Sequence, residues 1–66
     1  MTLRYRSMLA AIANGVRIQR ITPQHGRDLA EIFQRHDRGG WPITMAHHEA
    51  VERGLLRPIR QGVTPE

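Results

Sequence analysis

The chain has 66 residues, which is enough for one small domain, and 39% of them are hydrophobic. It contains no cysteine, which excludes a disulfide framework, a thiolate metal site and a cysteine nucleophile. Its cations are ten arginines and no lysine against six acids, and the formal net charge of +4 favours an anionic partner.

The first predicted element is a helix over residues 3–14. Large apolar side chains recur there at i, i+3, i+4 and i+7, the spacing of one helical face: Tyr5, Met8, Leu9 and Ile12. Gly15 suits the left-handed conformation that follows the last turn of many helices. We therefore expect the helix to end at Gly15 and to bury this stripe.

Residues 16–21 are predicted to form a short β-strand. Val16 and Ile18 alternate there with polar side chains, and the alternation breaks at Arg20. This strand would pair with a second strand near the C-terminus.

A second helix is predicted to start at Pro23. Thr22 is typical of an N-cap, and proline at the first helical position loses no hydrogen bond. The predicted buried stripe of this helix is Leu29, Ile32 and Phe33. On its outer side, Glu31 is spaced i, i+4 from both Arg27 and Arg35, so ion pairs are expected there. The helix should end at residues 37–40, which include two glycines.

Trp41 lies in the turn that follows, and the proline after it restricts its backbone to an extended conformation. A tryptophan ring buries about 150 to 250 Å². We expect Trp41 to close the end of the core against Phe33 and Val51. An exposed Trp41 would instead indicate an anchor for an interface.

A third helix is predicted from an N-cap at Thr44 to about Arg53. Its mainly apolar face carries Ala46, His47, Ala50 and Val51, and its opposite face carries Met45, His48, Glu49, Glu52 and Arg53. His48 and Glu52 could share a metal ion at i, i+4, but two ligands do not complete a zinc site, so no metal is predicted.

Residues 55–60 are predicted as the second β-strand, which Pro58 confines to a sheet edge. The expected fold is mainly α, with three helices and a minimal two-stranded β-sheet. Residues 1–61 would form the single domain and residues 62–66 a flexible tail.

This order of elements resembles that of a winged-helix domain, in which a helix-turn-helix pair is followed by a β-hairpin. Residues 44–59 are similar to the third helix of such domains running into the next strand, with Gly54, Leu55 and Leu56 at the transition. Residues 20–29 resemble the strand, proline turn and helix that follow the wing in some regulators. The resemblance implies binding to double-stranded DNA as a homodimer.

Arginine is concentrated in the first twenty residues, which carry four arginines and no acid. Guanidinium groups bind phosphates and guanine edges bidentately. If the two strands pair beside the first helix, six arginines gather as DNA-backbone contacts: Arg4, Arg6, Arg17, Arg20, Arg57 and Arg60. Base contacts from the third helix would involve His48, Glu49, Glu52 and Arg53, although carboxylates beside phosphates oppose strong readout.

The leading interpretation is a cytoplasmic, non-enzymatic DNA-binding protein of transcriptional regulation or recombination, with no cofactor. No nucleophile elbow, phosphate-binding glycine loop or paired carboxylate site is present in the sequence. No apolar run reaches the roughly 18 residues of a membrane span. The alternative is an inhibitor or adaptor, of the kind mobile elements encode, that docks on an acidic surface of a larger protein.

Overall fold

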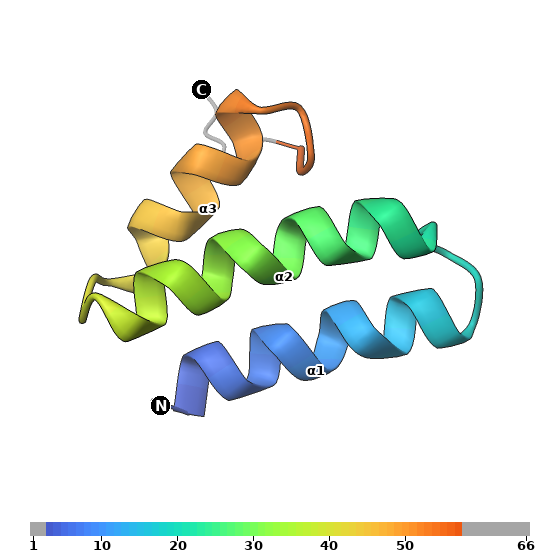
Figure 1. The fold of residues 1–66 in the computed structure, drawn as a ribbon, viewed down its shortest axis with the longest axis horizontal. Helices are drawn as coiled ribbons and strands as arrows, with labels where there is room; N and C mark the ends of the chain where they lie inside the picture. Colours follow the sequence, from blue (N-terminus) through green and yellow to red (C-terminus); the bar gives the residue numbers. More distant parts are fainter. Residues whose placement is uncertain (1–2, 58–66) are drawn as a thin grey trace, which may run out of the picture.

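The computed structural model describes residues 3–57, which form three α-helices: α1 (Leu3–Arg17), α2 (Pro23–Arg38) and α3 (Ile43–Glu52). The mainly α fold class is thus confirmed. α1 and α2 run antiparallel, and α3 crosses α2 obliquely (Figure 1). α2 packs against both other helices and is therefore the centre of the fold.

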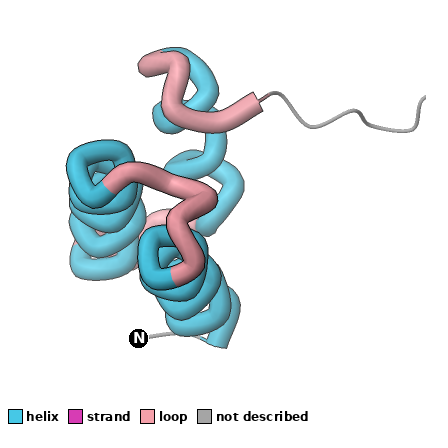
Figure 2. Tube along the Cα trace, turned by 90° about the vertical axis from the view of Figure 1, so that its right-hand side faces the viewer, coloured by secondary structure: helices cyan, strands magenta, loops and turns pink. Residues whose placement is uncertain are grey.

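None of the residues in 3–57 forms a β-strand (Figure 2), so the predicted two-stranded sheet is not seen. Residues 16 and 17 belong to the last turn of α1, and residues 18–21 make the turn into α2. Residues 55–57 continue from α3 without strand structure. The rest of the second predicted strand and the predicted tail at 62–66 lie outside the described residues.

α1 is longer than predicted because Gly15 packs inside it and does not end it. A Cβ on residue 15 would lie only 2.6 Å from Cδ1 of Ile21, which folds back against the helix. A Cβ on residue 26 would lie 2.4 Å from Cγ2 of Val16. Gly15 and Gly26 are both buried, so small residues are needed where the chain reverses and α1 meets α2.

Each helix ends in a Schellman motif, in which two successive N–H groups donate back to carbonyls of the last turn. The left-handed residue of the motif is Gly40 after α2 (φ 73°), Gly54 after α3 (φ 74°) and Gln19 after α1 (φ 64°). A residue with a Cβ adopts this conformation at a cost of about 1 to 2 kcal/mol. The C-terminal end of α1, with Gln19 in the left-handed position, is therefore the most strained of the three helix ends.

We expect Gln19→Gly to raise the free energy of unfolding by roughly 0.5 to 1 kcal/mol, because relief of the strain exceeds the added entropy of glycine in the unfolded chain. Thermal unfolding followed by circular dichroism measures this as a Tm higher by a few degrees. Gln19→Ala keeps the Cβ and should show no such rise. A lower Tm for Gln19→Gly would contradict the conformation at this position.

The core lies where α2 meets the other two helices. The ring of Phe33 is completely buried and packs edge-on against Tyr5 of α1, with centroids 6.4 Å apart, and against His47 of α3, at 5.6 Å. One side chain thus joins all three helices. The predicted apolar faces are confirmed by the buried side chains, which are Tyr5, Ile12, Leu29, Ile32, Phe33, Ala46 and Ala50.

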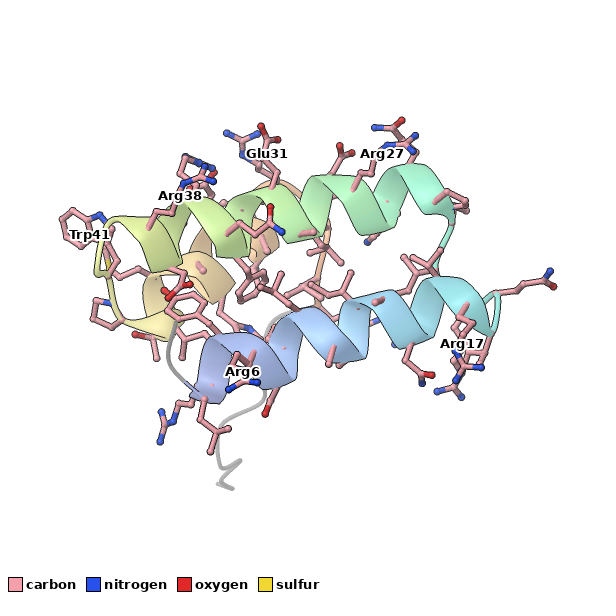
Figure 3. All side chains as sticks on the ribbon, turned by 60° about the horizontal axis from the view of Figure 1, so that its bottom comes forward. Arg6, Arg17, Arg27, Glu31, Arg38 and Trp41 are labelled. Atoms are coloured by element: carbon pink, nitrogen blue, oxygen red, sulfur yellow. The ribbon has the colours of Figure 1, made fainter. Side chains whose placement is uncertain are left out.

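The prediction that Trp41 closes the core is wrong. Its side chain is 55% exposed and points away from the helices (Figure 3). The backbone fixes this outcome, because the Tyr5 hydroxyl donates to the Trp41 carbonyl at 2.6 Å and the Trp41 N–H donates to the His36 carbonyl at 3.0 Å. One edge of the indole lies against Gly39, where a Cβ would come within 2.6 Å of Cδ1, and the rest of the ring is accessible to contacts outside the domain.

The two predicted N-caps have different outcomes. Thr22 caps α2 as predicted, since its Oγ1 accepts from the His25 N–H at 3.1 Å, and Pro23 is the first helical residue. The Thr44 cap is wrong because α3 begins at Ile43, two residues earlier than this cap predicts, and Thr44 lies inside its first turn. Pro42 holds the N-cap position there, and no side chain accepts from the helix end.

Candidate nucleic-acid interface

Four exposed arginines lie on the outer surface of α1 and α2, and those of α2 project from the edge turned away from α1 (Figure 3). Arg6 and Arg17 belong to α1, and Arg27 and Arg38 belong to α2. The two arginines of each helix are eleven residues apart, which is three helical turns, so they share a side at an axial spacing of about 16 Å. We call these four residues the arginine face.

The helix order places the four arginines near the corners of this face. Because α1 and α2 are antiparallel, Arg6 lies toward the end of Arg38, and Arg17 toward the end of Arg27. Between Arg6 and Arg17 the same stripe of α1 carries Ala10 and Ala13, whereas between Arg27 and Arg38 the stripe of α2 carries Glu31 and Gln34 (Figure 3). The short side chains let a rigid partner approach the backbone of α1 closely.

None of these four arginines forms an ion pair within the described part of the chain, although Glu31 lies between Arg27 and Arg38. Arg17 donates to Oδ1 of Asn14 at 2.6 Å and Arg27 to Oε1 of Gln24 at 3.1 Å, and both acceptors are neutral amides. The expected ion pairs of Glu31 with Arg27 and Arg35 do not form. The guanidinium charges therefore remain available to an anion.

Two other arginines, Arg35 and Arg53, form ion pairs with the carboxylate of Glu49. Its carboxylate accepts from Arg35 Nη2 at 2.5 Å and from Arg53 Nε at 3.1 Å, and lies 3.5 Å from His36 Nε2. The hydrogen bond from Arg35 is the main cause that lowers the pKa of Glu49, and desolvation of the carboxylate acts in the opposite direction. This cluster ties α3 to α2.

We expect Glu49→Gln to lower the Tm at pH 7 and to lose this deficit on acidification. The folded state holds the pKa of Glu49 below its unfolded value, so the carboxylate stabilises the fold above about pH 4.5 and this contribution disappears as the pH falls through the folded pKa. Thermal unfolding of both proteins between pH 3 and 7 tests this. Glu31→Gln is the matched control, and a deficit of equal size at pH 3 would show that the effect is not electrostatic.

Of the six predicted DNA-backbone arginines, the structure brings only Arg6 and Arg17 together on this face. Arg4 lies on the other flank of α1, and Arg20 lies in the turn between α1 and α2. Arg57 follows a segment held at the first turn of α2, where His25 Nε2 lies 2.7 Å from the Leu55 carbonyl oxygen. Arg60 is outside the described residues.

The predicted base-contacting residues of α3 are largely paired with one another. Glu49 and Arg53 form the ion pair described above, and His48 Nε2 lies 3.2 Å from Glu52 Oε2 on the solvent side. The two carboxylates of this surface outnumber the Arg53 guanidinium, so it offers little attraction to phosphate. The sequence-based prediction did not include Arg27 and Arg38 of α2. Their spacing of eleven residues, which is three helical turns, could have indicated that they share one side of the helix.

Comparison of the chain with protein-family models, curated proteins and solved structures gives no significant match. Within residues 3–57, no three histidine, aspartate or glutamate side chains converge in a way that could hold a metal ion. No helix in the described range is both long and apolar enough to cross a membrane.

Proposed function

We propose that the protein binds double-stranded DNA through the arginine face, chiefly by contacts to phosphates. The observation that carries the proposal is the set of four exposed arginines, two on each helix, with no carboxylate partner among the described residues. The major groove of B-DNA is about 12 Å wide. Arginines about 16 Å apart along one helix can therefore reach phosphates on both sides of that groove.

The distribution of acids favours the α1 part of this face, because Glu31 lies between the two arginines of α2. α1 carries no carboxylate, and the acids of the described chain lie on α2 and α3: Asp28, Glu31, Asp37, Glu49 and Glu52. A polyanion is attracted to the side that α1 forms and repelled from α3. In this proposal α3 is not the element that enters the groove, which differs from the expectation drawn from winged-helix domains.

The chemistry of the face favours contacts that do not depend on base sequence. The alanine side chains between Arg6 and Arg17 cannot read base edges, and phosphate contacts position a protein without specifying a sequence. We also propose that the protein acts in transcriptional regulation or recombination. A homodimer would lengthen its contact with the DNA.

The test is fluorescence anisotropy of a labelled mixed-sequence duplex of about 20 base pairs, titrated with the full chain between 50 and 200 mM salt. Four phosphate contacts predict a slope of log affinity against log salt of about −3.6, or a loss of roughly 150-fold across this range. No detectable binding at 50 mM salt, or a slope near zero, would reject the proposal.

A further inference from the structure

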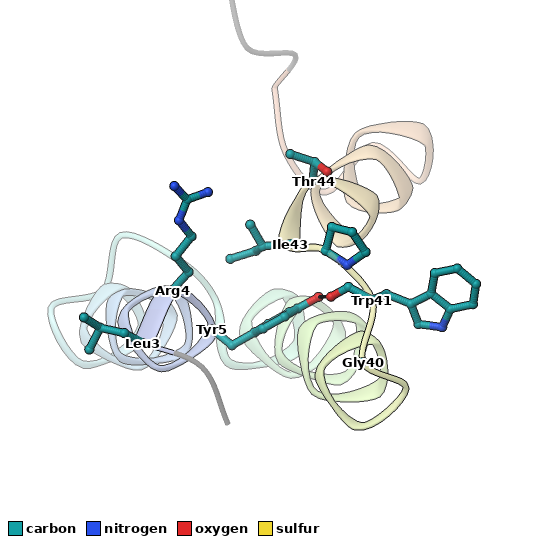
Figure 4. A pocket seen from close by; sticks show the side chains of 8 residues that line it. Leu3, Arg4, Tyr5, Gly40, Trp41, Ile43 and Thr44 are labelled. Atoms are coloured by element: carbon teal, nitrogen blue, oxygen red, sulfur yellow. Dashed lines mark hydrogen bonds between the residues drawn. The ribbon is translucent and has the colours of Figure 1, made fainter.

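A groove opens between α1 and α3, on the flank of α1 opposite the arginine face (Figure 4). It has two adjoining parts, with volumes of about 520 and 440 Å³, that share Leu3, Arg4 and Ile43 as lining residues. α2 packs along both helices but does not fill the space between them. The groove therefore offers a seat for one more element.

The lining of the groove is largely apolar. Met8 and Ala11 of α1 face Ile43 of α3 across it. Leu3 at one edge is 75% exposed, and Trp41 at the mouth is 55% exposed. The two side chains project in opposite directions at the two ends of this part of the groove (Figure 4). Large apolar side chains left this exposed are typical of a docking surface for a partner.

The charge at the groove has one sign. Arg4 is the sole charged side chain among the described residues that line either part, and no carboxylate within residues 3–57 pairs with it. Its guanidinium projects over the opening between α1 and α3 (Figure 4). The complementary occupant thus has an apolar stripe bordered by negative charge.

A second copy of the chain does not fit this description. The apolar stripes of its three helices are already buried in its own core. α1, the helix with an open flank, carries no carboxylate that could meet Arg4 of another copy. The occupant that matches the groove is therefore a different protein.

We infer that the groove binds an amphipathic helix of a partner protein whose apolar stripe is flanked by glutamate or aspartate. Leu3 and Ala11 are eight residues apart, which is about 12 Å along α1 and accommodates about two turns of such a helix. Apolar anchors of the partner contact Leu3, Met8 and Ile43, and a carboxylate meets Arg4. The arginine face lies on the other flank of α1, so DNA and this partner bind without overlap.

The probe is a fluorescein-labelled amphipathic peptide of about 14 residues, with leucine at i, i+3, i+4 and i+7 and glutamate beside the stripe. A matched peptide has lysine in place of glutamate. The acidic peptide should bind the full chain saturably and shift the amide NMR signals of Leu3, Ala11 and Ile43. Arg4→Glu should weaken the acidic peptide at least tenfold and strengthen the lysine peptide, and Leu3→Glu should abolish binding of both.

Arg6→Glu is the control, because it makes the same charge change on the other flank of α1 and should alter peptide affinity by no more than about twofold. Both positions are exposed, so each variant should keep its Tm. No saturable binding, or equal losses for Arg4→Glu and Arg6→Glu, would overturn the inference. A concentration-dependent dimer that Leu3→Glu disrupts would assign the groove to a second copy and overturn it as well.

Discussion

Phe33→Ala is expected to leave the chain largely unfolded at 25 °C. The Phe33 side chain is fully buried and is the contact point of Tyr5 from α1 and His47 from α3. Truncating a buried phenylalanine to alanine costs about 3 to 5 kcal/mol. The core of a domain this small rarely contributes more than about 3 to 5 kcal/mol to the free energy of unfolding, so the substitution removes nearly all of it.

The measurement is thermal and urea unfolding followed by circular dichroism, with Trp41→Ala as the control. The Trp41 side chain is half-exposed, so its truncation should lower the free energy of unfolding by no more than about 1 kcal/mol. If Phe33→Ala melts cooperatively near the wild-type Tm, or if Trp41→Ala is the more damaging change, the core is not organised around Phe33.

The position of Phe33 was predictable because it depends on a periodic pattern. The apolar residues recur over about two turns of α1 and one turn of α2, and such a stripe has one way to be buried. The Thr22 cap was predictable for a similar reason, since a threonine followed by proline satisfies the helix end with local atoms alone.

The strand predicted at residues 16–21 failed because its evidence was short and local. Four alternating residues fit a strand as well as the last turn of a helix and the turn that follows it. The decisive contacts are tertiary, namely Ile21 against Gly15 and Val16 against Gly26. These packing needs make Gly15 a buried helical residue and leave the left-handed position to Gln19, which no local preference selects.

The candidate site was half predictable from the sequence. Arg6 and Arg17 were selected by the absence of acids around them, but Arg4 was grouped with them although it lies on the opposite flank of the same helix. The phase of α2 could have added Arg27 and Arg38, had Arg27 not been assigned to an ion pair with Glu31. The flank of α1 that faces α3 is set by the tertiary packing and could not be predicted from the sequence.

Neutralising either end of the arginine face is expected to weaken DNA binding about 60-fold at 0.1 M salt. By the counterion-release rule, each phosphate contact contributes a factor of about eight at this concentration. Arg6→Gln with Arg38→Gln removes one end of the face, and Arg17→Gln with Arg27→Gln removes the other. Each double variant should also make the salt slope shallower by about 1.8.

The matched controls are Arg4→Gln with Arg57→Gln, which remove the same charge from exposed positions outside the arginine face. Through the general field alone, this pair should weaken binding by no more than about threefold and leave the slope near its wild-type value. Anisotropy titrations at several salt concentrations separate the two results. If the control pair loses as much affinity as the two double variants, attraction depends on net charge rather than on this surface, and the four arginines do not form a discrete interface.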